Sequence, residues 1–305
     1  MDSIRTANFN YFIGTKVGTC TIMKELGRGA MGVVYTAYQG SLKRLVAIKI
    51  LPKEFVSDVL SPERFRQEAE TAAYLTHPNI VPIYEIGETD DFYYIIMQLV
   101  RGKSLGIILS NMKKHPVPSK RIMPFKDSIK LIINVLDALG FAHREGTIHQ
   151  DIKPDNILIE EKTKRAMITD FGIARLSRGE NLPVKRGVVV GTPIYMAPEQ
   201  AAGKETDGRA DIYSVGVLLF LMVAGGLPVR PETGTQTVIR KITNPDSFFL
   251  KRPSQINPNI NPEMEMIIFK AIASHPDLRF QNCQEFIDAL KKYYINYISN
   301  QETWF

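Results

Sequence analysis

The chain has 305 residues, 44% of them hydrophobic, which is enough for one large domain or two lobes with a substantial core. Its 38 Lys and Arg against 32 Asp and Glu give a net charge of +6, and this mild excess does not indicate a nucleic-acid-binding protein. Two cysteines are too few for a disulfide framework or a zinc site, so we expect a reducing, cytoplasmic location.

No stretch of the sequence predicts a membrane span. Residues 1–10 are polar and lack the apolar core of a signal peptide. The most apolar run, residues 215–229, is shorter than the roughly 18–20 residues that a spanning helix needs. We therefore expect this run to form a buried helix in a large core.

Three glycines near the N-terminus, Gly27, Gly29 and Gly32, follow the G-x-G-x-x-G spacing. That spacing alone is a weak signal, since dinucleotide-binding folds also use it. A dinucleotide fold would begin a helix at Gly32, whereas residues 33–36 (Val-Val-Tyr-Thr) favour a β-strand. The pattern therefore predicts a hairpin whose tip lets backbone N–H groups approach phosphates closely.

The next predicted strand, residues 45–51, carries a single lysine, Lys49, in an apolar run. Such a lysine either faces solvent or grips a phosphate while a glutamate holds it. A helix is predicted to follow, because Pro62 suits a first helical position and His77-Pro78 ends the pattern. Its apolar residues recur at near-helical spacing, so this helix should pack on the strands.

Two more strands are predicted at residues 80–86 and 92–99. After them, residues 111–124 form a basic, proline-interrupted segment that contains Lys113, Lys114, His115, Lys120 and Arg121. This segment is either a solvated loop or a docking patch, and the sequence leaves both interpretations open.

Two short polar runs follow a predicted helix at residues 125–145, which Gly146 ends. The first run reads H-Q-D-I-K-P-D-N at residues 149–156, and its proline and aspartates favour a loop. The second reads D-F-G at residues 170–172, after a short apolar segment. Each run precedes or follows a predicted strand, so both should lie at strand ends.

These runs supply the residue types that phosphoryl transfer needs. A carboxylate such as Asp151 can orient an attacking hydroxyl, and a lysine such as Lys153 can offset charge on the moving phosphoryl group. Asn156 and Asp170 are oxygen ligands that suit magnesium. We expect His149 to brace the loop backbone rather than to move protons.

The C-terminal half contains further residues that should tie the loops to the core. Residues 191–199 read G-T-P-I-Y-M-A-P-E. Asp211 opens the apolar helix predicted at residues 212–225. Further along, Arg279 carries a two-pronged guanidinium, which suits a buried carboxylate such as Glu199.

From residue 18 to residue 290 the chain resembles the catalytic domain of Ser/Thr protein kinases, and its G-x-G-x-M-G-V-V-Y and G-T-P-x-Y-M-A-P-E-Q runs resemble the bacterial branch. Seven motifs occur in order at compatible spacings, and the resemblance implies that Asp211 anchors the backbone of the 149–156 loop and that Arg279 pairs with Glu199. The resemblance implies an α+β, bilobal protein-kinase fold, with a small lobe of five antiparallel strands and one helix and a mostly helical large lobe. It divides the chain into a lead-in (1–17), small lobe (18–100), large lobe (101–295) and tail (296–305).

The resemblance also implies that ATP and magnesium, or manganese in its place, bind between the lobes. It assigns the metal to Asn156 and Asp170, and catalytic roles to Asp151, Lys153, Thr192 and Lys49, the last held by Glu68 with Glu70 as the alternative. It assigns nucleotide contacts to Leu26, Gly27, Arg28, Gly29, Ala30, Met31, Gly32, Val33, Val34, Ala47, Lys49, Met97, Gln98, Val100 and Leu158.

The substrates implied are proteins with Ser or Thr acceptors, because Lys153 follows Asp151 by two residues and Thr192 can bridge the two. Self-phosphorylation and a homodimer are further expectations. Two other classes stay open: a pseudokinase scaffold that binds nucleotide and partners, and a small-molecule phosphotransferase. Against the first, Lys49, Asp151 and Asp170 are all retained, and against the second stand the 192–199 element and Arg279.

One departure from the family pattern concerns regulation. The usual His-Arg-Asp reads His-Gln-Asp here, with Gln150 in place of the arginine that helps to hold a phosphorylated activation loop. Between Gly172 and Gly191 the only hydroxyl side chain is Ser177. The sequence therefore predicts a kinase that does not depend on phosphorylation of this segment.

Overall fold

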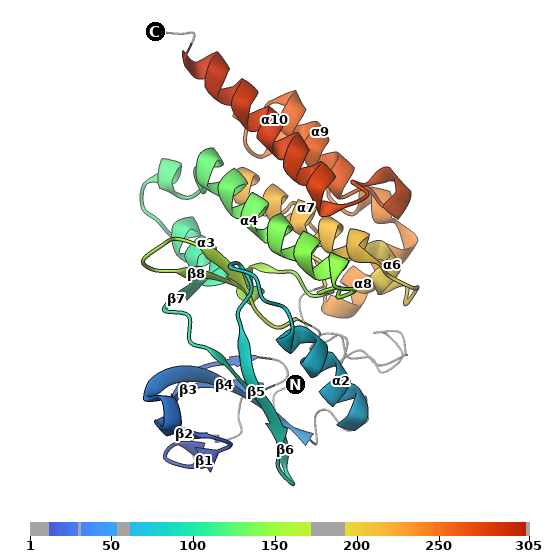
Figure 1. Ribbon diagram of the computed structural model, residues 1–305. Coiled ribbons are helices and arrows are strands. Elements are labelled where there is room, and N and C mark those ends of the chain that lie inside the picture. The colour runs from blue at the N-terminus through green and yellow to red at the C-terminus, as the bar shows by residue number, and fades with distance from the viewer. Residues whose placement is uncertain (1–11, 30–31, 54–61, 172–192, 303–305) are drawn as a thin grey trace.

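The computed structural model describes residues 12–29, 32–53, 62–171 and 193–302. Figure 1 shows two lobes, a small one built from strands with α2 beside them and a large one built mainly from helices. The predicted α+β, bilobal protein-kinase fold is confirmed. The sheet differs in one detail from the five strands expected.

The small lobe contains a six-stranded antiparallel sheet in the order β1-β2-β3-β4-β6-β5. The sixth strand is β1, a two-residue strand in which Lys16 pairs with Thr21 and Val17 with Cys20. Two residues are too few to show an alternating pattern, so the sequence did not predict this strand. The strands are β1 (Lys16–Val17), β2 (Cys20–Gly29), β3 (Gly32–Gln39), β4 (Arg44–Pro52), β5 (Ile83–Glu88) and β6 (Phe92–Gln98).

The two faces of this sheet carry two separate apolar clusters. Val33 and its neighbours on alternate positions pack with Phe12 on one face, and Ala47 and Met97 pack toward the large lobe on the other. This division follows from the two-residue period of a strand. Gly32 is required where β3 meets β4, since a Cβ there would lie 2.1 Å from the carbonyl oxygen of Ile50.

Helix α2 (Pro62–Ala73) begins at the proline predicted for its first position but ends before the predicted His77. The chain then crosses to the large lobe, where the side chain of Asn79 donates to the carbonyl oxygen of Ala166 at 2.6 Å. Ile80 forms an isolated bridge with Ile168. These contacts explain why α2 stops early and why β5 starts three residues later than predicted.

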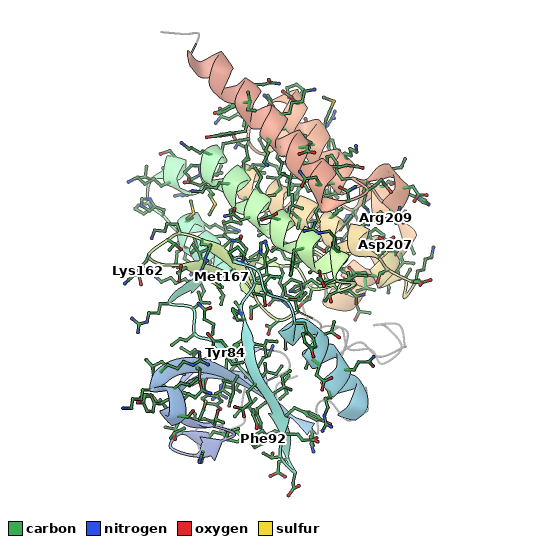
Figure 2. The ribbon with its side chains drawn as sticks, viewed as in Figure 1. Tyr84, Phe92, Lys162, Met167, Asp207 and Arg209 are labelled. Carbon is green, nitrogen blue, oxygen red and sulfur yellow. The ribbon has the colours of Figure 1, made fainter. Side chains whose placement is uncertain are left out.

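The large lobe has a helical core with a small three-stranded sheet, β7-β8-β9, at its boundary with the small lobe. Met167 of β9 lies at this boundary (Figure 2) and packs into the inner cluster of the small lobe. The elements are β7 (Gly102–Ser104), α3 (Leu105–Lys113), α4 (Phe125–Arg144), β8 (Ile157–Glu160), β9 (Ala166–Ile168), α6 (Pro198–Ala201), α7 (Gly208–Ala224), α8 (Gly234–Thr243), α9 (Pro262–Ala271) and α10 (Cys283–Glu302).

Helix α7 is the centre of this core. It lies against α4 and α9, and nearly all of its residues from Ala210 to Ala224 are buried. Residues 215–224 of the apolar run lie in this helix and are mostly buried as predicted, whereas residues 225–229 follow its end and are only partly buried. Within the described parts of the chain, no helix has both the length and the apolar character needed to cross a bilayer.

The predicted pair between Arg279 and Glu199 is confirmed. The guanidinium binds both carboxylate oxygens, at 2.6 and 2.7 Å, and Arg279 is only 1% exposed. Its remaining N–H groups donate to the carbonyl oxygens of Ala273, Arg209 and Ser274. All five donors of the guanidinium are therefore satisfied, which is the condition under which burying this charge is tolerated.

A second buried cation lies close to this pair. Lys241 of α8 is fully buried, donates to the hydroxyl of Tyr213 at 3.0 Å and lies over the ring of Phe248. Burial, with a further contribution from the charge of Arg279, lowers the pKa of Lys241 well below its ordinary value. The burial of Lys241 was not predicted, because a lysine in an amphipathic helix is expected on the exposed face.

Arg279→Ala should unfold the large lobe more easily. Removing one partner of a buried pair costs about 3–5 kcal/mol, since the other charge is left uncompensated. The matched control is Arg66→Ala, because Arg66 pairs with Glu88 at 3.2 Å but the two side chains are 67% and 37% exposed. That exposed pair should contribute at most about 1 kcal/mol. Urea unfolding of both variants tests this, and equal losses would contradict the structural role of Arg279.

Candidate active site

One buried carboxylate fixes the backbone of the 149–156 loop. Asp211 is 0% exposed in the first turn of α7. Its two oxygens accept the successive N–H groups of His149 and Gln150, at 2.9 and 2.8 Å. The expectation that Asp211 anchors this loop is confirmed.

A histidine that the sequence analysis did not single out neutralises this carboxylate. Nε2 of His143, at the end of α4, lies 2.8 Å from Asp211 and donates to it. Burial by itself would lower the pKa of His143, but the hydrogen bond and charge of Asp211, with a contact to Cys283, raise it to about 10. The imidazolium in turn keeps the pKa of Asp211 below its ordinary value despite the burial of that carboxyl.

His149 braces the loop as expected. Its Nε2 lies 2.9 Å from the carbonyl oxygen of Thr169, and its Nδ1 accepts the N–H of Asp151 at 3.1 Å. Because a carbonyl can only accept, Nε2 carries the proton, and the ring is the neutral tautomer. The ring also packs edge-on against Phe171, with 4.7 Å between centroids. His149 therefore joins the two polar runs to each other.

Both runs contain a residue in the left-handed backbone region. Gln150 has φ of 63° and Asp170 has φ of 67°. Such conformations cost on the order of 1 kcal/mol or more outside glycine and persist where neighbours hold them. Gln150 is held at both ends, because its carbonyl accepts from Gln200 and its side-chain amide donates to Thr206 at 2.9 Å.

The loop brings Asp151, Lys153 and Asn156 together. Nζ of Lys153 lies 2.6 Å from Oδ2 of Asp151. The amide nitrogen of Asn156 donates to the same Oδ2 at 3.0 Å and to the carbonyl oxygen of Asp151 at 2.8 Å. Because the side-chain nitrogen of Asn156 is engaged in this way, its side-chain oxygen Oδ1 can face a cation.

Across from this group, Lys49 and Asp170 form an ion pair of 2.7 Å. Lys49 comes from β4 and is 8% exposed, so it does not face solvent as one interpretation of the sequence had it. Burial would raise the pKa of Asp170, but the charge and hydrogen bond of Lys49, with a further contribution from the charge of Lys153, hold it below its ordinary value. Asp170 is therefore an ionised carboxylate.

Several predicted site residues lie outside the described part of the chain. These are Ala30, Met31, Thr192 and the side chain of Glu68, whose helix backbone is described. The described acidic partner of Lys49 is Asp170. Glu70, the alternative to Glu68, is exposed and lines a hollow between α2 and β5.

The apolar residues predicted to surround the nucleotide base come together on one face of the small-lobe sheet. Ala47 and Met97 are paired across β4 and β6, and Val34, Val100 and Leu158 pack against the same cluster. Val33 does not join them. Its side chain is 1% exposed in the cluster on the opposite face, so only its backbone can face this side.

The remaining predicted nucleotide contacts lie on the strands that border this face. Leu26, Gly27, Arg28 and Gly29 belong to β2, and Gly32 begins β3. The guanidinium of Arg28 binds Glu25 at 2.8 Å. Gln98 ends β6, where its N–H donates to the carbonyl oxygen of Pro82.

These residues fit a nucleotide and a divalent cation. Around Gly27 a Cβ would meet no atom within 4 Å, so the hairpin has open space where phosphates can approach its backbone. Asn156 and Asp170 lie close together, because the backbone carbonyl oxygen of Asn156 accepts the N–H of Thr169, the residue before Asp170, at 3.0 Å. Among the described residues no group of three or more His, Cys, Asp or Glu side chains could hold a metal ion.

Sequence reasoning missed His143, which binds the anchoring residue Asp211, and it also missed Gln200 and Thr206, which both bind Gln150. No local pattern marks these residues, because each lies at least 50 positions from its partner in the sequence. His143 and Asp211, for example, are 68 positions apart. The one available signal for His143 was a histidine near the end of an apolar helix that leads into the loop.

Fold and site together define a two-lobed phosphotransferase architecture. The family model for the protein kinase domain matches residues 20–294, and the chain belongs to that family. A probable serine/threonine-protein kinase of Clostridium perfringens is 36% identical over 271 residues, covering 89% of this chain and 38% of that protein. The serine/threonine-protein kinase PrkC of Bacillus subtilis is 35% identical, covering 90% and 40%.

Among solved structures, the kinase domain of PknI from Mycobacterium tuberculosis is similar, with a TM-score of 0.73 and 28% identity. The match covers 92% of this chain and 97% of that domain. The chain spans about two-fifths of the length of the two curated relatives named above.

The pair of His143 and Asp211 should make stability depend on pH. The unfolded histidine loses its proton near pH 6.5, whereas the folded one keeps it to about pH 10. The contribution is therefore complete below pH 6.5 and is lost as the pH rises to 10, with a slope of up to about 1.4 kcal/mol per pH unit. Urea unfolding across this window should show a flatter slope in His143→Gln than in the wild type.

His115→Gln serves as the control for this measurement, because His115 lies in the loop after α3 and forms no contact with Asp211. Its slope should match that of the wild type. An unchanged slope in His143→Gln would show that this histidine is not the group that binds the extra proton.

Proposed function

We propose that this chain transfers the γ-phosphoryl group of ATP to serine or threonine hydroxyls of proteins. The nucleotide would lie between the small lobe (18–100) and the large lobe (101–295), with magnesium, or manganese in its place. The observation that carries this proposal is the pair of polar groups that face each other, Asp151 with Lys153 and Asn156 on one side and Lys49 with Asp170 on the other. The names of the relatives, which are serine/threonine-protein kinases, support it.

Each residue has a role that follows from its chemistry. Asp151 accepts a hydrogen bond from the attacking hydroxyl and takes its proton as the hydroxyl oxygen bonds to the γ-phosphorus, while the bond from that phosphorus to the β,γ-bridging oxygen breaks and ADP leaves. Lys153, 2.6 Å from that carboxylate, lies where it can offset the charge of the moving phosphoryl group. Thr192 would bridge these two residues beside the acceptor hydroxyl.

The second group holds the nucleotide. Lys49 binds phosphate oxygens, and Glu68 is proposed to position it once Asp170 turns to the cation. The carboxylate of Asp170 and the side-chain oxygen of Asn156 are the proposed metal ligands. A cation held by these two residues would supply positive charge that stabilises the negative charge developing on the phosphates during transfer.

Lys49→Met and Asp151→Asn should each lower phosphorylation of a generic basic protein on the order of 100-fold or more, since each removes a positioned group. Lys53→Met is the matched control, because Lys53 follows the same strand but pairs with the exposed Glu88. Labelled ATP, with and without magnesium, is the assay, and melting curves verify folding. Turnover near the wild-type level in Lys49→Met or Asp151→Asn would exclude these roles, and an inactive wild type that binds nucleotide would point to a scaffold.

We further propose that activity does not require phosphorylation of the segment between Gly172 and Gly191. A phosphate there needs an arginine-like partner, and Gln150 offers a neutral amide that already donates to Thr206. Self-phosphorylation elsewhere on the chain is compatible with this proposal.

Ser177→Ala should therefore keep most of the activity of the wild type, and so should protein treated with a phosphatase. The physical reason is that position 150 carries no cation that could bind a phosphorylated Ser177 and so order the segment around it. The measurement is the initial rate with the same basic protein before and after treatment. Loss of activity that returns when Ser177 becomes phosphorylated again would contradict the proposal.

A further inference from the structure

The positive charge of this chain is concentrated in one short stretch. Residues 101–126 contain seven Lys and Arg and no Asp or Glu. The other 279 residues carry 31 Lys and Arg against 32 Asp and Glu, so their net charge is −1. The whole excess of +6 therefore comes from a segment that the proposed catalytic chemistry does not use.

Five of the seven cations gather around one exposed turn. Lys113 ends α3, Lys114 follows it, Lys120 and Arg121 lie at the 3-10 turn Pro118–Lys120, and Lys126 lies in the first turn of α4. All five are exposed. We call them the basic surface. Within the described chain none of them forms an ion pair with a carboxylate, and the one acidic residue next to them in sequence is Asp127.

The basic surface is built on an ordered turn. Nε of Arg121 donates to the carbonyl oxygen of His115 at 2.8 Å, and Nδ1 of His115 accepts the N–H of Val117 at 3.1 Å. Ile122 then lies against Gly225, the cap of α7, and Met123 packs on the large-lobe core. These contacts hold the turn against the core of the large lobe, so the exposed lysines extend from a turn of defined conformation.

Apolar side chains accompany the cations. Val117 is 43% exposed between two prolines at the tip of the turn, and Ile107 is 51% exposed on α3. Ile107 and Lys114 are seven residues apart, so they share one face of that helix and its end. Lysines beside exposed apolar residues are typical of protein surfaces that contact a lipid headgroup layer.

The location suits a broad partner. In Figure 1 the turn between α3 and α4 lies on the flank of the large lobe opposite α6 and α8. The hollow between α2 and β5 and the one behind Asp170 are both lined by other residues. The basic surface is thus a set of spread cations around an exposed tip, which fits an extended anionic surface better than a single phosphate or a peptide that needs a groove.

We propose that the basic surface binds the anionic face of a lipid bilayer, with Val117 at the level of the headgroups. This proposal is independent of the proposed catalytic activity. Each basic residue near an anionic membrane strengthens binding about fivefold, so reversing three of them should weaken it on the order of a hundredfold or more. The attraction is electrostatic and should fall steeply with salt.

Co-sedimentation of the full chain with vesicles tests the proposal. Vesicles of phosphatidylcholine with phosphatidylglycerol should bind the wild type at low salt, and vesicles of phosphatidylcholine alone should not. The triple variant Lys113→Glu, Lys114→Glu, Lys120→Glu should lose this binding while keeping its melting curve. Val117→Ser should weaken binding by a smaller factor.

The matched control changes the same number of charges elsewhere, at the exposed lysines Lys24, Lys43 and Lys251, each to Glu. It should bind far more tightly than the first triple variant. Equal losses in the two triple variants would mean that net charge alone acts, and this would overturn the basic surface as a site. Absence of binding to the anionic vesicles, or binding only to heparin or an acidic protein, would overturn the membrane as its partner.

Discussion

The geometry of the site depends on one buried carboxylate. Asp211 accepts two successive backbone N–H groups from the 149–156 loop, and a third hydrogen bond from His143 supplies the charge that makes its burial tolerable. Hydrogen bonds to a buried charge contribute about 1.5–3 kcal/mol each, which is enough to hold Gln150 in a left-handed conformation. With that turn fixed, Asp151 and Asn156 have only one place to lie.

A second constraint joins the lobes. His149 links the loop to the carbonyl oxygen of Thr169, and Asn79 links the segment after α2 to β9. Asp170 therefore has a fixed position relative to both the loop and β4, where Lys49 meets it at 2.7 Å. Lys49 and Asp170 lie 121 residues apart in the sequence, and they meet because hydrogen bonds to the backbone carbonyl oxygens of Thr169 and Ala166 hold the segment before Asp170 in place.

Much of the site was predictable because its residues are close in sequence. Asp151, Lys153 and Asn156 lie within six positions of one another, so a loop of almost any shape brings them near each other. The anchoring roles of Asp211 and of Arg279 with Glu199 were also predicted, although from the resemblance to a family and not from spacing. His143, Thr206 and Lys241 were missed, because their partners are distant in sequence and ordinary residue types give no sign of such pairings.

The sequence by itself determined most strand and helix types and the identity of the groups around Asp151, since these depend on local periodicity and short-range motifs, and the two-lobed class followed from the resemblance to a family that the motifs carry. Only the tertiary structure decided where α2 stops, where β5 starts, and that Lys49 meets Asp170. The tertiary structure also decided that the basic turn after α3 is rigid, because its support comes from Gly225 and the core. Contacts between distant segments set these features, and a local pattern carries no record of them.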